Sequence, residues 1–414
     1  MPSTLTYAEA RGRVLAAVRP LPPERIPVGE ARGRALRQNI VAAHPLPPFR
    51  NSSMDGVAVC SADLADATDS TPAFITVVEV LPAGRTTSRA LAGGEAIRIM
   101  TGAMIPDGAD AVVPVEDLET LPGSPERVRI RRPAPPGQNF REAGRDLAAG
   151  DPVLGEGREL SAHDLGLLAS LGEAHVLVGR PPVVAAFSTG DELLDAGAPL
   201  VPGAIRDGNL PMLAALLEEC GARVARAARL PDDPVKVTEA LGRALSSADV
   251  VLTIGGVSAG DFDPVKQSIG ELESVELWRV AMKPGRPQAF GTPSGRLFFG
   301  LPGNPASVAC VFEAFVRPAL RKLQGFAQLE RPHVAVQVAE AIPSRAGRTD
   351  LVRVTLARRD QRWWAAPAGD QVSGHLTPQS RAHALLIVPE ERESLAVGDG
   401  ADAILLRWPE TGER

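Results

Sequence analysis

The stretch from Asp249 to Lys266, DVVLTIGGVSAGDFDPVK, constrains the fold more than any other part of this chain. It begins with the apolar, β-branched run 250–254, which is typical of a buried strand in a parallel sheet. The chain then passes through Gly255, Gly256 and Gly260, where the backbone can turn sharply and approach a ligand because no Cβ intervenes. The pattern predicts a strand that ends in a glycine turn.

Two carboxylates and a helix start follow this turn. Asp261 and Asp263 precede Pro264, which predicts a helix with Asp263 as its N-cap. A helix N-terminus after a glycine turn presents N–H groups and a positive dipole end to a phosphate. Since the acids would repel a bare phosphate, a divalent cation between them is expected. An ordinary αβ loop with capping explains the glycines equally well, but it explains the paired acids less well.

Length and charge restrict the class of protein. A chain of 414 residues is long enough for roughly two to four domains. Its apolar content of 44% and charged content of 23% are those of a soluble globular protein. A net charge of −6 gives no general affinity for nucleic acid or for an anionic membrane.

The cysteines indicate a reducing compartment. Cys60, Cys220 and Cys310 are widely spaced and form no C-x-x-C motif, which argues against a disulfide framework and against a zinc cluster. No apolar run reaches transmembrane length, and residues 1–20 lack a signal-peptide core. We expect a cytoplasmic protein without membrane partners.

Alternation of strand and helix patterns predicts the fold class. This is an α/β multidomain protein with a doubly wound, mostly parallel sheet domain over residues 179–326. Residues 49–146 are rich in strands and turns and predict an inserted β-rich subdomain. Residues 1–48 and 147–178 carry a capped helix each, at Thr6 and at Ser161, and the two helices are expected to pack together in a discontinuous linking domain. Five short strands in 327–414 predict a small β-barrel-like domain.

Ligands of doubly wound sheets bind beyond the carboxyl ends of the strands. Four polar or glycine-rich loops are predicted at that edge, namely 188–192, 232–233, 255–263 and 300–305. Another helix is expected over residues 209–220, with Asn209 as its N-cap.

The edge carries three acidic pairs and a basic loop. Asp191 with Glu192, Asp232 with Asp233, and Asp261 with Asp263 supply the hard oxygen ligands that suit Mg²⁺. Asp232-Asp233-Pro234 alone is better explained as a helix N-cap. The loop 282–287, MKPGRP, with Arg279 and Lys266 near it, suits a polyanionic substrate, although a solvated turn is the simpler alternative. The six histidines are scattered, so the pattern favours metal-assisted phosphate chemistry over a nucleophilic triad.

Six motifs together resemble the molybdopterin molybdenumtransferases, the molybdenum insertase family that includes the E domain of gephyrin. They occur in the family's order between residues 51 and 308 and read NSSMDGVA, IMTGA, STGDEL, GGVSAGDFD, MKPGRP and GLPGNPAS. The resemblance implies an enzyme that inserts molybdenum from molybdate into the dithiolene of adenylylated molybdopterin and releases AMP with the help of Mg²⁺. It also implies a homodimer, with each site formed between the sheet domain of one subunit and the β-rich subdomain of the other.

The resemblance carries roles to individual residues. It implies catalytic roles for Asp55, Thr101, Asp146, Glu192, Asp232, Asp263 and Lys283, the first three acting from the second subunit. Glu192, Asp232 and Asp263 would hold the metal. The substrate-binding set comprises Gly255, Gly256, Ser258, Lys266, Arg279, Arg286, Pro302, Asn304, Pro305, Arg348, Arg353 and Ser373. Arg279 and Arg286 stand where the family has lysine, and Val57 stands where it has tyrosine. A guanidinium is planar and bidentate and so is not equivalent to an ammonium. The sequence therefore does not fix the affinity for the oxyanion.

Two other functions fit parts of the sequence. A molybdopterin adenylyltransferase has a similar sheet domain and glycine loop, but it usually lacks flanking β domains. A non-catalytic, gephyrin-like scaffold would have lost the acids and Lys283, which this chain keeps. A molybdopterin adenylyltransferase and molybdoenzyme maturation factors are conceivable partners.

Overall fold

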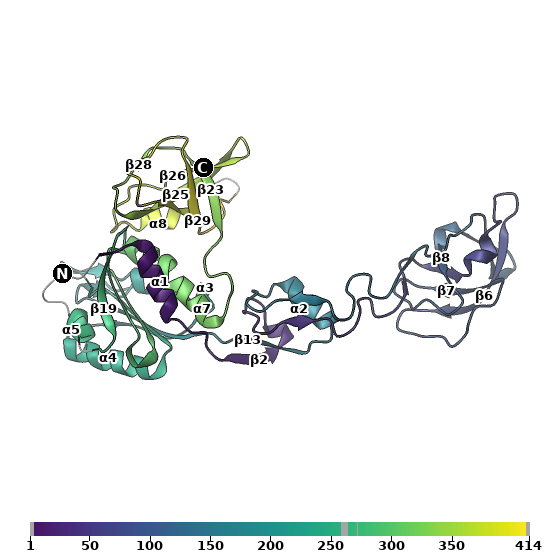
Figure 1. Ribbon diagram of the computed structural model, residues 1–414, viewed down its shortest axis with the longest axis horizontal. Helices are drawn as coiled ribbons and strands as arrows, with labels where there is room; N and C mark the ends of the chain where they lie inside the picture. Colours follow the sequence, from purple (N-terminus) through teal and green to yellow (C-terminus); the bar gives the residue numbers. More distant parts are fainter. Residues whose placement is uncertain (1–3, 258–263, 271, 411–414) are drawn as a thin grey trace. The chain divides into compact units, whose positions relative to one another are not determined.

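The computed structural model describes residues 4–257, 264–270 and 272–410. It divides into two compact units (Figure 1). The first comprises residues 1–38, 156–166 and 174–414, and the second comprises 39–155 and 167–173. The finer division into four domains stays a prediction. No helix of the described residues is long and apolar enough to span a bilayer.

A mixed sheet of seven strands forms the centre of the first unit. Its order is β1 (Thr4–Leu5), β19 (Val275–Val280), β21 (Pro287–Gly291), β22 (Leu297–Leu301), β18 (Val250–Ile254), β14 (Val183–Thr189) and β17 (Arg223–Leu230). All neighbouring strands are parallel except β19 with β21 and β21 with β22. The predicted mostly parallel sheet is confirmed.

Helices cover both faces of this sheet (Figure 1). On β14, Val184 and Ala186 pack in one apolar core with α1 (Tyr7–Ala17), α3 (Asn209–Glu219) and α6 (Pro305–Val311). Ala185 and Phe187 point to the other face and pack with α4 (Pro234–Ser247). Because successive side chains of a strand point to opposite faces, a strand apolar at every position must be covered on both sides. The helices α5 (Pro264–Gly270) and α7 (Arg317–Gln324) complete the two layers.

Both predicted capped helix starts are confirmed, but the expected packing of the two helices is not. Thr6 and Glu9 form a capping box on α1, and Ser161 and Asp164 form the same reciprocal pair on α2 (Ala162–Ser170). The expectation that these two helices pack together is wrong, because the buried Ala10 and Val14 of α1 join the sheet core and α1 contacts α7.

The C-terminal part of the first unit is a closed barrel of five strands. They are β25 (Thr349–Arg359), β26 (Arg362–Pro367), β23 (His333–Val338), β29 (Gly400–Leu405) and β27 (Ala384–Val388), with β27 pairing back to β25. The short strand β20 (Met282–Lys283) runs parallel to β25, so the basic loop after β19 is attached to the barrel. A short helix, α8 (Thr377–Arg381), precedes β27. The pairing of β20 with β25 places the barrel at the edge of the sheet where ligands are expected.

A six-stranded sheet forms the core of the second unit. Its order is β8 (Ala111–Pro114), β5 (Gly56–Val59), β7 (Glu95–Ile99), β6 (Ala73–Leu81), β10 (Ser124–Ile130) and β9 (Leu118–Leu121). Beside it, β4 (Asn51–Ser52) pairs with β11 (Phe140–Arg141).

Short strand pairs complete the two units, namely β2 (Pro23–Pro27) with β13 (His175–Gly179), β3 (Ile40–Val41) with β12 (Pro152–Leu154), β15 (Leu193–Leu194) with β16 (Ile205–Arg206), and β24 (Ile342–Pro343) with β28 (Ser394–Leu395).

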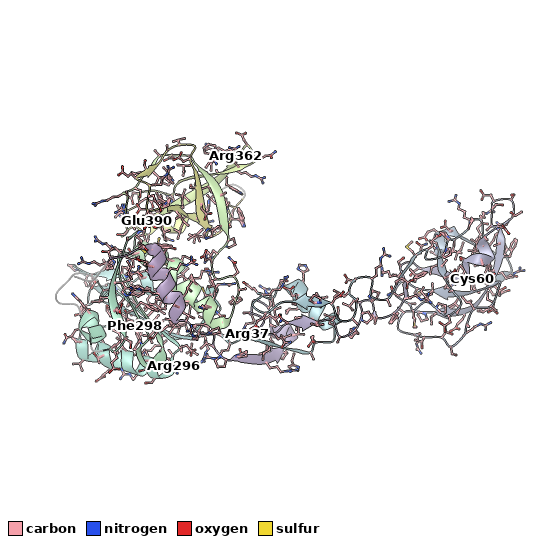
Figure 2. The ribbon with its side chains drawn as sticks, in the orientation of Figure 1. Arg37, Cys60, Arg296, Phe298, Arg362 and Glu390 are labelled. Atoms are coloured by element: carbon pink, nitrogen blue, oxygen red, sulfur yellow. The ribbon has the colours of Figure 1, made fainter. Side chains whose placement is uncertain are left out.

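The three cysteines differ in burial. Burial raises the pKa of the Cys220 thiol to about 11 and that of Cys310 to about 12, whereas Cys60 in the second unit is half-buried (Figure 2). The thiolate is the reactive form, so a raised pKa slows alkylation. We therefore expect iodoacetamide at pH 8 to label Cys60 first in the native protein, as measured by peptide mass spectrometry. Equal labelling of all three thiols in the native state would contradict this order.

Candidate functional site

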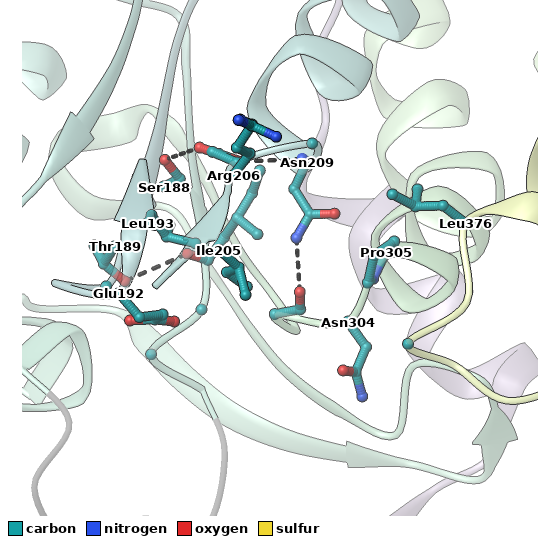
Figure 3. Close-up of a pocket in the computed structure, with 18 of the residues that line it drawn as sticks. Ser188, Thr189, Glu192, Leu193, Ile205, Arg206, Asn209, Asn304, Pro305 and Leu376 are labelled. Atoms are coloured by element: carbon teal, nitrogen blue, oxygen red, sulfur yellow. Dashed lines mark hydrogen bonds between the residues drawn. The ribbon is translucent and has the colours of Figure 1, made fainter. Parts of the chain in front are cut away.

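A cavity of about 630 Å³ opens at the carboxyl ends of β14, β18 and β22 (Figure 3). We call it the acidic pocket because Glu192 and Asp232 line it. Its other walls are Ser188, Thr189, Gly190, Leu193, Ile205, Arg206, Asp207, Gly208, Asn209, Ile254, Gly255, Gly256, Gly303, Asn304, Pro305, Gly374 and Leu376. The predicted meeting of the four loops at one edge is thus confirmed for their described residues. Ser258, Asp261 and Asp263 lie outside the described residues.

Glycines make room for the loops of this pocket. Gly255 has a φ of 91°, and a Cβ there would lie 3.0 Å from the Thr189 Oγ1 atom. A Cβ on Gly190 would collide with the Glu192 carboxylate. A side chain at either position would therefore displace a neighbouring group of the pocket.

The two acids of the Asp232-Asp233 pair have separate tasks. Asp233 is the N-cap of α4, and its Oδ1 atom accepts hydrogen bonds from the N–H groups of Val235 and Lys236 at 3.0 and 3.3 Å. Asp232 faces the pocket, and its backbone and carboxylate exchange two hydrogen bonds of 3.2 Å with Asp191. The capping interpretation thus holds for Asp233, and Asp232 remains available to a ligand.

The donor set of the acidic pocket fits Mg²⁺. This ion is usually held by one or two carboxylates, with waters and substrate phosphates completing its shell. Glu192 and Asp232 are exposed carboxylates of one cavity, which matches that requirement. Within the described residues no cluster of three or more acidic, histidine or cysteine side chains could enclose an ion. Two protein carboxylates would leave the other positions around such an ion to waters and phosphates.

A second cavity, of about 910 Å³, adjoins the first. We call it the basic pocket because Lys283, Arg286 and Arg348 line it. Its other walls are Gly255, Gly256, Val257, Met282, Pro284, Gly285, Pro287, Pro302, Gly303, Asn304, Ser307, Gln371, Val372 and Ser373. Both pockets share Gly255, Gly256, Gly303 and Asn304, so one ligand can extend from the carboxylates to the cations across the glycine turn.

Hydrogen bonds join the walls of the two pockets. Asp207 accepts a bond of 2.6 Å from the Ser188 hydroxyl and bonds of 2.9 and 3.0 Å from the first two N–H groups of α3. The Asn209 side chain donates to the Gly303 carbonyl at 2.7 Å (Figure 3). Asn304, the next residue, donates to the Ser373 hydroxyl at 2.9 Å. These bonds fix the loops of the sheet and of the barrel to each other.

Family comparisons cover most of the chain. Residues 5–172 match the MoeA N-terminal region (domain I and II), 185–322 match a "Probable molybdopterin binding domain", and 335–406 match the MoeA C-terminal region (domain IV). Molybdopterin molybdenumtransferase 2 of Mycobacterium tuberculosis is 38% identical over 96% of this chain and 98% of its own length. The chain belongs to the molybdopterin molybdenumtransferase family. It is thus related to enzymes of molybdenum cofactor biosynthesis.

Two further relatives extend the match. The molybdopterin molybdenumtransferase of Haemophilus influenzae is 35% identical over 95% of this chain and 97% of its own length. The crystal structure of the molybdopterin biosynthesis MoeA protein from Pyrococcus horikoshii OT3 has a TM-score of 0.81 and 30% identity, covering 97% of this chain and all of that one. Resemblance to the molybdopterin molybdenumtransferases is thereby confirmed over at least 95% of the chain.

The substrate-binding residues predicted for this molybdopterin molybdenumtransferase separate into two groups. Gly255, Gly256, Arg286, Pro302, Asn304, Pro305, Arg348 and Ser373 line one or both pockets, as does the predicted catalytic Lys283. Lys266 on α5 and the exposed Arg279 on β19 are not among the described residues lining either pocket. Arg279 pairs across the sheet with Thr4 and Pro287, and its contact with substrate stays a prediction.

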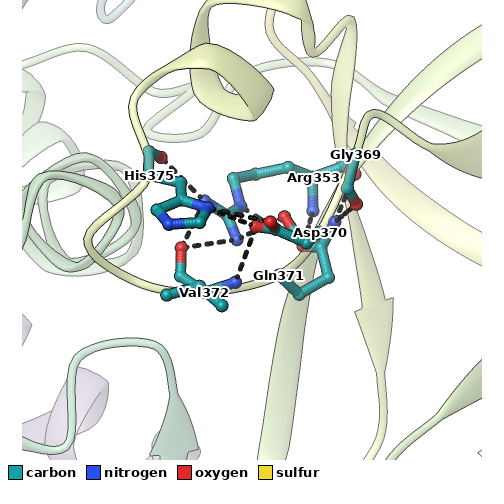
Figure 4. A network of polar contacts seen from close by, with 6 residues as sticks. All are labelled: Arg353, Gly369, Asp370, Gln371, Val372 and His375. Carbon is teal, nitrogen blue, oxygen red and sulfur yellow. Dashed lines mark hydrogen bonds and ion pairs between the residues drawn. The ribbon is translucent and has the colours of Figure 1, made fainter.

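Arg353 lies under the basic pocket. It is 1% exposed, and its guanidinium donates to the carbonyls of Asp370, Val372 and His375 and to the Gln371 side chain at 3.2–3.3 Å (Figure 4). Burial lowers the pKa of this guanidinium. Direct substrate contact by Arg353 is therefore not supported, because its donors hold the loop that carries Ser373.

The residues predicted to act from a second subunit lie in the second unit. Asp55 Oδ1 accepts hydrogen bonds from the Thr101 N–H at 2.7 Å and the Thr101 hydroxyl at 2.8 Å, and both keep the pKa of the Asp55 carboxyl below its ordinary value. Asp146 is exposed, and its N–H donates to the Leu46 carbonyl at 2.9 Å. Exposed apolar side chains lie on the same two loops as Asp55 and Thr101, namely Phe49, Met54, Met100 and Met104.

The sequence analysis missed Asp207 and misjudged Asn209. The N-cap of α3 is Gly208, Asn209 is the first helical residue, and Asp207 accepts from the N–H groups at the helix start. The only available signal was an acid two residues before a helix that follows a strand, which is a common loop pattern.

Proposed function

We propose that this enzyme inserts molybdenum from molybdate into the dithiolene of adenylylated molybdopterin and releases AMP in a Mg²⁺-dependent step. The supporting observation is the adjacency of an acidic and a basic pocket across one glycine turn. The acidic side suits a nucleotide pyrophosphate with its metal, and the basic side suits an oxyanion. The names of the curated relatives agree with molybdenum transfer to molybdopterin.

The chain's own residues would divide the work between the pockets. Glu192 and Asp232 would hold Mg²⁺, which would neutralise the pyrophosphate charge as the anhydride is cleaved. Gly255 and Gly256 let the phosphates approach the backbone closely. Lys283, Arg286 and Arg348 would collect molybdate beside the dithiolene. The hydrogen bonds through Asp207, Asn209 and Asn304 hold the acidic and the basic pocket at a fixed spacing, which orients the reacting groups.

A second copy of the chain is proposed to complete each site. The exposed pair of Asp55 and Thr101, beside exposed methionines, supports this arrangement because such apolar side chains mark contact surfaces. In a twofold dimer each subunit would supply Asp55 to the other subunit's pocket.

Subunit mixing tests this arrangement. Asp55→Asn and Glu192→Gln variants should each be inactive alone, because every site then lacks one carboxylate. After subunit exchange, half of the dimers are mixed and each has one intact site, so about a quarter of the wild-type AMP release should return. An equal mixture of wild type with either variant should keep half of the wild-type AMP release with or without exchange, so it controls for any inhibition by the variant subunits. No recovery despite exchange, measured by native mass spectrometry, would refute the shared site.

Two alternative functions predict different results in activity and binding assays. An adenylyltransferase would consume ATP with free molybdopterin, and a scaffold would fail to bind the pterin nucleotide. The match of all three family regions, including those flanking the sheet domain, favours the insertase.

A further inference from the structure

A third cavity, of about 400 Å³, lies away from the acids and cations described above. Helix α3, the turn after α6, helix α8 and the barrel end at Leu406 enclose it. Its walls are Met212, Leu216, Glu219, Ala309, Glu313, Arg331, Leu376, Gln379, Ser380, Ala382 and Leu406. We call it the α3–α8 cavity. Its volume is within the range of small-molecule sites and far above the share of one water molecule.

A buried carboxylate belongs to this cavity. Glu313 is 6% exposed and lies in η5 (Phe312–Val316), a π-helical turn between α6 and α7. Single π turns inside helices are frequent at functional sites. Burial raises the pKa of the Glu313 carboxyl. A buried carboxylate is costly unless its oxygens are satisfied, so the bonds of its two oxygens are informative.

One Glu313 oxygen is satisfied and the other is not. Oε1 accepts a hydrogen bond of 2.9 Å from Arg331 Nε, and Arg331 also binds Glu219 at 2.8 Å. Oε2 is buried and accepts no hydrogen bond from the described residues. Oε2 forms an ion pair with Arg317 Nε at 3.9 Å, which is too long for a hydrogen bond, and Arg317 does not line the cavity. Arg331 therefore satisfies Oε1, and Oε2 remains able to accept a hydrogen bond from a bound ligand.

A second acceptor in the same cavity also lacks a donor. The Oε1 atom of Gln379, on α8, is buried without a hydrogen-bond partner among the described residues. The charged walls are two carboxylates, Glu219 and Glu313, against one guanidinium, Arg331. Arg317, outside the lining, also pairs with Glu313, so no net charge is left over. Two acceptors without a donor, one of them a carboxylate oxygen, lie among apolar side chains, and this combination calls for a ligand with a donor cation on an apolar body.

We propose that the α3–α8 cavity binds a small organic amine, with its ammonium group on Glu313 and Gln379 and its apolar part against Met212, Leu216 and Leu406. Leu376 lines both this cavity and the acidic pocket. An amine in the cavity therefore contacts a side chain that also bounds the proposed nucleotide site. This site is independent of the proposed function, since none of the proposed catalytic residues lines it.

Binding of benzylamine to the full-length protein tests the proposal by titration calorimetry at pH 7.5. Benzyl alcohol is the matched neutral probe, and it should bind at least tenfold more weakly because it lacks the charge that Glu313 attracts. Glu313→Gln should weaken benzylamine binding about tenfold or more. Glu192→Gln should leave it unchanged, since that carboxylate belongs to the acidic pocket.

A second variant keeps the test decisive if Glu313→Gln fails to fold. Ser380 is exposed and lines the cavity, so Ser380→Trp should fill the space and abolish benzylamine binding without touching the core. Benzylamine that binds Ser380→Trp as tightly as wild type overturns the proposal. So does equal affinity for benzyl alcohol, or a loss of affinity in Glu192→Gln.

Discussion

Glu192→Gln is expected to lower the rate of AMP release from adenylylated molybdopterin roughly hundredfold or more. The amide keeps the shape of the side chain but removes the negative charge that a cation in the acidic pocket requires. Because Glu192 is exposed, the fold and its thermal stability should not change. The measurement is chromatographic detection of AMP in the presence of molybdate and Mg²⁺.

Glu239→Gln is the matched control for this change. Glu239 is an exposed residue of α4 that pairs with Arg243 one turn on, at 3.5 Å, so its replacement should leave AMP release unchanged. A wild-type rate in Glu192→Gln would show that the acidic pocket does not hold the reacting phosphates.

Arg353→Met is expected to lower the free energy of unfolding by about 3 kcal/mol or more, because each hydrogen bond from a charged group contributes about 1.5–3 kcal/mol. The guanidinium now donates to three carbonyls of the loop 370–375 (Figure 4). Loosening this loop should also raise the KM for molybdate, since Ser373 lines the basic pocket. Urea unfolding and steady-state kinetics measure the two effects.

Arg358→Met provides the comparison on the same strand. Arg358 is exposed at the end of β25, so its replacement should change stability by no more than about 0.5 kcal/mol. If Arg353→Met were as stable as Arg358→Met, the loop would not depend on the buried guanidinium.

Much of the sheet domain could be predicted because its signals are local. A strand such as β14, apolar at successive positions, indicates cover on both faces, and the two separate cores on either side of it confirm that cover. The loops at its carboxyl edge follow from the rule that parallel strands end together. Their residues were therefore identified before their contacts were known.

The features that were missed depend on distant partners. The apolar stripe of α1 fits any apolar surface, and the pairing of β1 with β19 directs the helix to the sheet. Arg353 resembles a surface cation in sequence, yet the loop 370–375 folds over it and buries it. Asp207 gains its importance from Ser188, which lies 19 positions away. Sequence pattern indicates which face is apolar or which group is polar, but not which partner it meets.

The central claim is that one site couples cleavage of the adenylyl anhydride to molybdenum insertion. The most direct measurement counts AMP released and molybdenum bound to the pterin in a single turnover. We expect one AMP for each molybdenum inserted, with both lost when molybdate is omitted or Mg²⁺ is chelated. AMP release that proceeds unchanged without molybdate, or molybdenum insertion without AMP release, would contradict it.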